Sequence, residues 1–156
     1  MSAALLVHCH PTPGSFTSAV RDRVLAGLSA AGHDVRQIDI TDQPCAEAPN
    51  GERSIVLVYP TWWSGQPAVL QHWLATHHDR FGAVDRLIAV TTHGSPYRTN
   101  LFEGQAGRRI LRREVLPRCA PGARFQWLAC YRIDDCPNDD RLAFLDRVER
   151  HFTRLR

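Results

Sequence analysis

The chain has 156 residues, of which 44% are hydrophobic and 22% are charged, and its formal net charge is +3. This length is typical of one domain and can bury a core without disulfides or metal, so we expect a single domain over residues 1–156. The charge is too small and too dispersed to indicate nucleic acid or an anionic membrane as a partner. All 19 basic residues are arginine, which excludes Schiff-base and P-loop chemistry because both need a lysine.

Cysteine usage and hydropathy bear on the cellular compartment. The five cysteines are widely spread and form no Cys-x-x-Cys pair, which is typical of a reducing environment and not of a zinc ribbon or a thioredoxin motif. The first apolar run is short and follows no basic segment, so we expect a strand there and not a signal peptide. No apolar stretch approaches the roughly 20 residues that a membrane span needs. We therefore expect a cytoplasmic protein.

Apolar runs alternate with helix-like segments along the chain. The expected strands, some of them apolar throughout, are 3–9, 34–40, 54–59, 86–92 and 125–133. The expected helices are 16–31, a segment that begins at Pro67, 107–116 and 139–155; the last carries Leu142, Leu145, Val148 and Phe152 at helical spacing. This alternation predicts an α/β protein with a parallel sheet, right-handed crossovers and ligands at the carboxyl ends of the strands. Segment 42–53 is too short for a full helix, so one crossover is expected to be a loop.

The loop after the first strand, residues 10–18, has the features of a phosphate site. Ser15 can cap the helix that follows, and the end of that helix carries roughly half a unit of positive charge. The pattern is neither a Walker A motif nor G-x-G-x-x-G, which disfavours ATP and Rossmann-type NAD binding. The alternative is a serine-capped helix after a proline turn, without a ligand.

The loops after the third and fourth strands add aromatic and polar groups. Residues 59–65 read Tyr-Pro-Thr-Trp-Trp-Ser-Gly, and at least one indole is expected to face a cleft, where it can pack on a planar ring. The alternative is that both indoles bury the following helix. Residues 91–94 offer hydroxyl and amide groups for the polar edge of a heterocycle, or form an ordinary turn. Because strand ends meet at one edge of a parallel sheet, the loops together predict a nucleotide or flavin site.

These motifs resemble those of the flavodoxin-like NAD(P)H:quinone oxidoreductases. The matching residues are His10-Pro11 with Ser15-Phe16, Tyr59-Pro60-Thr61-Trp62-Trp63 with Pro67-Ala68-Val69-Leu70 and Trp73, Thr91-Thr92-x-Gly94, and Tyr131-x-x-Asp134 with Arg141. The resemblance implies a three-layer sandwich with a five-stranded parallel sheet of order 2-1-3-4-5. It also implies a homodimer with FMN or FAD at its interface and ping-pong transfer of two electrons from NAD(P)H to a quinone or similar acceptor. We expect FMN, because the short chain leaves little protein to hold an adenine.

The resemblance also assigns site residues by position. The flavin phosphate region would be held by His10, Ser15, Phe16, Thr17 and Ser18. The isoalloxazine ring would be lined by Pro60, Thr61, Trp62 and Trp63. Its polar edge would meet Thr91, Thr92, His93 and Gly94. The candidate catalytic residues are Tyr97 and His93, either of which would donate a proton or hydrogen bond to the quinone oxygen.

The chain departs from the family pattern beside the expected ring. Thr61 replaces an aliphatic residue, Ser64 an aromatic residue and His93 a glycine, and the shortened segment 42–53 removes wall from the pocket or dimer surface. Small members of the family also serve as regulatory subunits of bacterial potassium-efflux transporters. The alternative function is therefore a non-catalytic or weakly catalytic subunit that meets the membrane only through its partner.

Three further patterns in the sequence do not indicate an additional metal, catalytic or phosphate site. His8 and His10 point to one side of a strand, but no further ligand stands at an obvious spacing, so we expect no metal. Neither histidine is placed to activate Cys9, because neighbours on a strand point to opposite faces, and we expect an inert buried thiol. A basic run on one helix is expected to be a solvated face, with NADPH 2′-phosphate binding as the alternative: Arg108, Arg109, Arg112 and Arg113.

Overall fold

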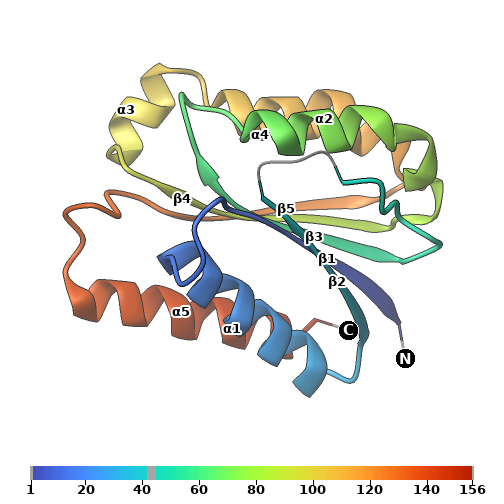
Figure 1. Cartoon of the computed structure of the whole chain (residues 1–156), viewed down its shortest axis with the longest axis horizontal. Helices are drawn as coiled ribbons and strands as arrows, with labels where there is room; N and C mark the ends of the chain where they lie inside the picture. Colours follow the sequence, from blue (N-terminus) through green and yellow to red (C-terminus); the bar gives the residue numbers. More distant parts are fainter. Residues whose placement is uncertain (1, 42–44, 156) are drawn as a thin grey trace.

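A five-stranded parallel sheet forms the centre of the computed structural model, which describes residues 2–41 and 45–155 (Figure 1). Its strands are β1 (Ala3–Cys9), β2 (Asp34–Ile40), β3 (Ser54–Thr61), β4 (Arg86–His93) and β5 (Arg124–Cys130). The strand order is β2-β1-β3-β4-β5 and every neighbouring pair is parallel. The expected fold class and strand order are thus confirmed.

Helices cover both faces of this sheet. The α-helices are α1 (Phe16–Ala30), α2 (Ala68–Thr76), α3 (Tyr97–Phe102), α4 (Ala106–Ile110) and α5 (Asn138–Thr153). Shorter helical segments are the 3₁₀ turns η1 (His78–Ala83) and η3 (Leu116–Arg118) and a π-helical turn, η2 (Leu111–Val115). Figure 1 shows α1 and α5 on one face and α2 and α4 on the other, which makes the three layers.

Alternation along each central strand divides the core in two. Leu5 and Val7 of β1 pack into the cluster beneath α2, whereas Ala4 and Leu6 pack into the cluster beneath α1 and α5. Successive side chains of a strand point to opposite faces, so a strand buried on both sides must be apolar throughout. The apolar runs in the sequence therefore correspond to the centre of the sheet.

The ends of α1 follow from its sequence. Ser15 caps its first turn, since the Ser15 hydroxyl accepts a hydrogen bond from the Ser18 amide. Gly32 ends it with φ +80°, a conformation in which glycine is not strained, while the His33 amide donates back to the Leu28 carbonyl over 3.1 Å. These two signals set the ends of α1, while Val20, Val24 and Leu28 pack it on the sheet.

Several expected boundaries are wrong. The last strand ends at Cys130 and not at residue 133, because Arg132 has φ +57° and the chain turns there. The helix expected over 107–116 is α4 continued by the π-helical turn and the 3₁₀ turn, and α3 and η1 were not expected. In α5, Leu142 is 46% exposed and Phe144 is buried in its place.

The shortened crossover is partly described. Residues 45–53 form no helix or strand, which confirms the expected loop for that part, whereas residues 42–44 lie outside the described residues. Trp73 of α2 covers this segment and donates its indole N–H to the Glu47 carbonyl over 2.7 Å. Across residues 2–41 and 45–155, no helix is both long and apolar enough to cross a bilayer.

We predict that Gly27→Ala destabilises the protein although alanine favours helices. A Cβ at Gly27 would lie 2.6 Å from the Phe152 Cβ and 2.7 Å from the Glu149 carbonyl oxygen, so α1 and α5 would have to separate. Urea unfolding is expected to show a loss of about 1–3 kcal/mol, as for other overpacked cores. Gly82→Ala is the matched control, since nothing lies within 4 Å of its Cβ position. Equal stability of the two variants would contradict the prediction.

Candidate functional site

The loops that follow β1, β3 and β4 meet at the carboxyl edge of the sheet. A hydrogen bond of 3.3 Å joins the Thr17 and Thr92 hydroxyls, and one of 2.7 Å joins the Thr61 and Thr91 hydroxyls. The rings of His10 and Trp62 contact edge to face, with 6.4 Å between centroids. The structure therefore brings together the three loops that the sequence singled out.

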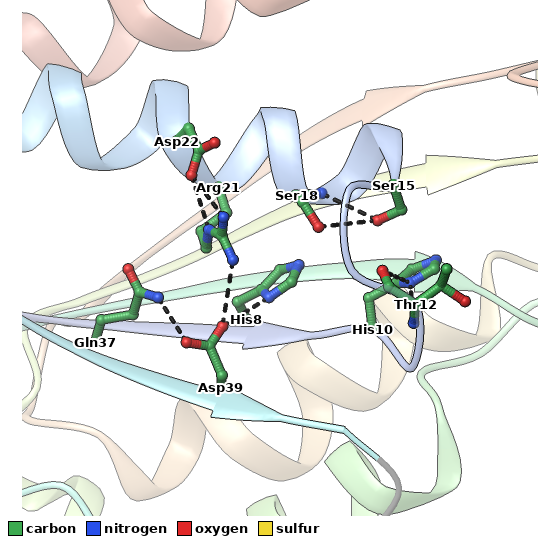
Figure 2. Close-up of polar contacts among 9 residues, drawn as sticks. All are labelled: His8, His10, Thr12, Ser15, Ser18, Arg21, Asp22, Gln37 and Asp39. Carbon is green, nitrogen blue, oxygen red and sulfur yellow. Dashed lines mark hydrogen bonds and ion pairs between the residues drawn. The ribbon is translucent and has the colours of Figure 1, made fainter.

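The first loop forms a polar turn at the start of α1 (Figure 2). The Ser15 hydroxyl lies 3.2 Å from the Ser18 amide nitrogen and 3.1 Å from the Ser18 hydroxyl. The His10 ring folds back on its own loop, where the Thr12 amide donates to Nδ1 over 2.9 Å. The first turn of α1 carries no acidic residue, so no carboxylate opposes an anion there. The turn has the groups and the charge that a phosphate needs.

Not every residue of this loop faces the turn. The Phe16 ring packs toward α5, with its centroid 6.3 Å from that of Phe144, so its main-chain amide is the group it can offer to a ligand. Thr17 is buried, and the hydrogen bond between its hydroxyl and that of Thr92 connects the turn to β4.

The second loop is a tight turn that holds an indole in solvent. The Trp62 and Gly65 main chains exchange hydrogen bonds of 3.0 and 2.9 Å, and between them Trp63 and Ser64 have φ values of 50° and 62°. The left-handed region is costly for residues other than glycine, and such strain gathers at functional sites. Trp63 is 99% exposed and Trp62 is 45% exposed. The strained turn thus presents aromatic surface, as expected for at least one indole.

Contacts with the α3–α4 region hold this turn in place. The Gly107 amide donates to the Ser64 carbonyl over 2.8 Å, and the Ser64 hydroxyl donates to the Glu103 carboxylate. A Cβ at Gly107 would lie 3.5 Å from the same carbonyl oxygen. Ser64 is therefore tied through both its main chain and its side chain.

The third loop contains a buried histidine in a defined tautomer. The Asn100 side-chain amide donates to the Ser95 hydroxyl over 2.8 Å and to the Pro96 carbonyl over 3.0 Å, so its oxygen faces His93. His93 Nδ1, which lies 2.7 Å from that oxygen, must then be the donor. Nε2 is left to accept from the Thr61 hydroxyl at 3.3 Å.

This histidine is neutral at neutral pH. Burial lowers the pKa of His93 to about 4, although the hydrogen bond with Asn100 acts in the opposite direction. Its ring is 5% exposed and stacks on Tyr131 with centroids 4.6 Å apart. Tyr97, which is half exposed, contacts Tyr131 edge to face, with centroids 5.3 Å apart. The two candidate catalytic residues are therefore linked through Tyr131, and only Tyr97 reaches solvent.

A cavity of about 450 Å³ lies between the second and third loops. Its lining includes five of the residues that the resemblance assigned: Thr61, Trp62, Trp63, His93 and Gly94. Ser64, Ser95, Asn100 and Glu103 complete the lining. Sequence reasoning did not select Ser95, Asn100 and Glu103, because they lie on or beside the unexpected helix α3. Tyr131 was quoted only as part of a family motif, although its place at the end of the last strand was a usable signal.

Of the residues assigned to the ring and its polar edge, three do not line the cavity, and the candidate catalytic residue Tyr97 does not line it either. Pro60, Thr91 and Thr92 are buried in β3 and β4, where Pro60 stands beside Thr92 in the parallel register. These residues can affect a bound ligand only indirectly, by positioning the loops that follow them.

Cys9 and His8, at the end of β1, do not form a second reactive centre. Cys9 is 1% exposed, and burial raises the pKa of its thiol to about 12, so it stays protonated at neutral pH. His8 Nδ1 lies 2.8 Å from Asp39 Oδ1, and Gln37 donates to the other oxygen of Asp39 over 2.7 Å (Figure 2). Within the described residues, no group of three His, Cys, Asp or Glu side chains could hold a metal ion.

The low pKa of His93 predicts a pH-dependent stability. Between the ordinary pKa of 6.5 and the folded value of about 4, the unfolded chain binds a proton that the folded protein does not bind. Stability is therefore lost as the pH falls through this window and is unaffected above it. The free energy of unfolding should fall when the pH is lowered from 7.5 to 4.5. This fall is expected to be about 2–3 kcal/mol smaller in His93→Gln than in the unsubstituted protein. Equal losses in urea titrations would contradict this assignment.

Solved structures of other proteins superpose on nearly the whole chain. Smu.1420 from Streptococcus mutans is 20% identical, with a TM-score of 0.78 and coverage of 98% of this chain and 100% of that one. An NAD(P)H:quinone oxidoreductase from Methanothermobacter marburgensis is 17% identical, with a TM-score of 0.75 and coverage of 97% and 94%. An FMN-dependent NADH-azoreductase from Bacillus anthracis, in complex with FMN, is 11% identical, with a TM-score of 0.78 and coverage of 99% of both chains. At these identities the likeness shows the fold alone.

Sequence comparison identifies the family. No curated protein sequence matches this chain significantly. A family model described as a flavodoxin-like fold matches residues 2–107, which is more than half of the chain and includes all three loops of the candidate site. Together with the strand order, this match shows that the chain belongs to the flavodoxin-like fold family.

Proposed function

We propose that this protein is a flavin-dependent reductase that transfers two electrons from NADH or NADPH, by way of FMN, to a quinone or azo compound. The observation that carries the proposal is the strained turn that holds Trp63 in solvent beside a cavity and a carboxylate-free helix N-terminus. Relatives of the same fold include an NAD(P)H:quinone oxidoreductase and an FMN-dependent azoreductase. FAD is the second candidate cofactor.

The residues present fit FMN. Its phosphate would bind at the first turn of α1, where main-chain amides have no acceptor within the helix. The assigned phosphate-binding residues are His10, Ser15, Phe16, Thr17 and Ser18. Its ring would lie over the cavity against Trp62 and Trp63, with its polar edge toward the loop 91–94, and Pro60 and Thr61 would support that position. Bound FMN supplies two-electron hydride chemistry, which no side chain of the protein can supply.

The chain itself would orient the donor and the acceptor. Trp62 and Trp63 offer flat apolar surface that excludes water from the planar faces of both substrates, and holding such partners in contact supplies much of the rate. Thr61 is held between Thr91 and His93, so its hydroxyl has a fixed direction at the cavity wall. Of the two candidate catalytic residues, Tyr97 is the exposed one, and it would have to reach the quinone oxygen from outside the cavity lining. Neutral His93 would act by orienting Thr61 and Tyr131.

A second copy of the chain would complete the site. Large apolar side chains are exposed on the second loop and on α3, among them Trp63 at 99%, Phe102 at 91% and Leu101 at 55%. Contiguous exposed apolar groups in a folded protein mark binding surfaces. We propose a cytoplasmic homodimer in which this surface is buried and no nucleic acid takes part.

A visible spectrum tests the proposed activity. Protein mixed with FMN and passed through gel filtration is expected to retain the flavin absorbance bands. Anaerobic NADH or NADPH should bleach these bands, and a quinone should restore them. Parallel samples with FAD and with riboflavin show whether the adenylate or the phosphate contributes to binding. Loss of all flavin at tens of micromolar protein would contradict the proposal and leave a partner-binding regulatory role to be tested.

We predict that Trp63→Ala weakens FMN binding without affecting the fold. The side chain is almost fully exposed and packs on nothing in the described part of its own chain, so its removal should leave the far-UV circular dichroism spectrum unchanged. Loss of ring packing is expected to raise the Kd for FMN about tenfold, or about 1.4 kcal/mol. Leu142→Ala is the control, because Leu142 is also an exposed apolar side chain but lies on α5 and does not line the cavity. Unchanged FMN affinity in Trp63→Ala, measured by fluorescence quenching, would exclude the indole as part of the site.

A further inference from the structure

Two thiols come together near the cavity between the second and third loops, which is called the cleft from here on. Cys130 ends β5, and Cys136 lies in the loop just before α5. Both line one cavity of about 370 Å³, together with Arg147 and Arg150. The Cys136 thiol lies within hydrogen-bonding reach of the Cys130 thiol. All five cysteines are free, so the two sulfur atoms are adjacent and unbonded.

The segment between these cysteines is bonded to the third loop of the candidate site. The Arg132 amide donates to the Ser95 carbonyl over 3.2 Å, and the Ile133 amide donates to the His93 carbonyl over 2.9 Å. Tyr131 stacks on the His93 ring. Any change in the backbone of residues 131–135 must therefore act on the wall of the cleft.

This segment is also held in an unusual conformation. Arg132 has φ +57°, and the Asp135 amide closes a turn on the Arg132 carbonyl over 3.0 Å. A Cβ at Gly94 would lie 2.7 Å from Asp134 Oδ2, so only glycine fits there without displacing that carboxylate. The turn brings Cys136 back toward the end of β5, which explains why thiols from two elements share a cavity.

We propose that Cys130 and Cys136 form a reversible disulfide when the protein meets a peroxide, and that this bond clamps residues 131–135 against the loop after β4. Cys136 is half-buried, whereas Cys130 is 7% exposed. Cys136 is therefore the thiol that a small oxidant reaches first, and Cys130 is the thiol that resolves the product. The proposal does not depend on the proposed reductase activity.

The chemistry balances with hydrogen peroxide as the oxidant. The Cys136 thiolate attacks one peroxide oxygen, which forms an S–O bond, breaks the O–O bond and releases hydroxide that takes up a proton to give water. The Cys130 sulfur then attacks the sulfur of Cys136, which forms the S–S bond and breaks the S–O bond. The departing hydroxide takes the proton of Cys130 and leaves as a second water. Two thiols lose two electrons, and one peroxide gains them.

Local electrostatics agree with these roles. Burial, and after it the neighbouring Cys136 thiol, raises the pKa of Cys130 to about 11, while Arg147 and Arg141 act in the opposite direction. Cys130 thus remains a thiol until the attack requires its proton to leave.

Peptide mapping tests the disulfide directly. Trypsin cuts after Arg132, between the two cysteines, so a disulfide would join peptides 125–132 and 133–141. Reduced protein treated with a small excess of hydrogen peroxide, alkylated and digested without reductant is expected to yield the joined pair and to lose two thiols per chain. Dithiothreitol should restore both thiols. Loss of thiols without the joined pair, or disulfides only between chains, would overturn the proposal.

Two variants and a second measurement sharpen the test. Cys130→Ser should abolish the joined pair, whereas Cys45→Ser, which removes another partly exposed thiol, should leave it unchanged. Oxidation should also slow hydrogen exchange of the Arg132 and Ile133 amides roughly tenfold, because the clamp opposes local opening. If the disulfide forms and these exchange rates stay unchanged, the coupling to the cleft is wrong.

Discussion

The parallel pairing of β1, β3 and β4 is the constraint on which the rest of the structure depends. Thr61 stands beside His93 in the register of β3 and β4, and His8 stands beside Val58 in that of β1 and β3. All three strands leave the sheet at the same edge, and apolar layers bury both of their faces. The strand register therefore brings the loops that follow to one place, as is general for doubly wound sheets, and contacts such as the Thr17–Thr92 hydrogen bond then join them.

A buried polar network gives one wall of the cleft its shape. The hydroxyls of Thr91 and Thr61, the His93 ring and the Asn100 amide form a continuous chain of hydrogen bonds. Polar groups in a core are costly unless they are paired, and a fully paired network is rigid. Because the imidazole here is neutral and has partners on both nitrogens, it serves better to orient its neighbours than to exchange protons. Tyr131 extends this rigidity to the segment between Cys130 and Cys136.

The opposite wall is built differently, from a strained turn and exposed aromatic surface. Trp63 and Ser64 both have positive φ, and contacts from Gly107 and Glu103 hold the turn. The unfavourable backbone is thus offset by helix α4 and the segment before it. A rigid polar wall that faces an apolar, solvent-exposed one suits a planar ligand with one polar edge, and it leaves apolar area for a second protein surface to cover.

The sequence by itself determined the α/β class, the buried strands and the three loops, because apolar runs, helix caps and strand-end motifs are local features. It also determined that Ser15 caps α1, since the cap is a contact between residues three apart. Only the tertiary structure decided that His93 is buried and neutral, that Phe16 turns toward Phe144, and that Asn100 and Glu103 from the α3 region line the cleft. These features depend on contacts between elements distant in the chain. The approach of the Cys130 and Cys136 thiols depends instead on a turn at Arg132, which has a positive φ. No local sequence pattern predicts this conformation.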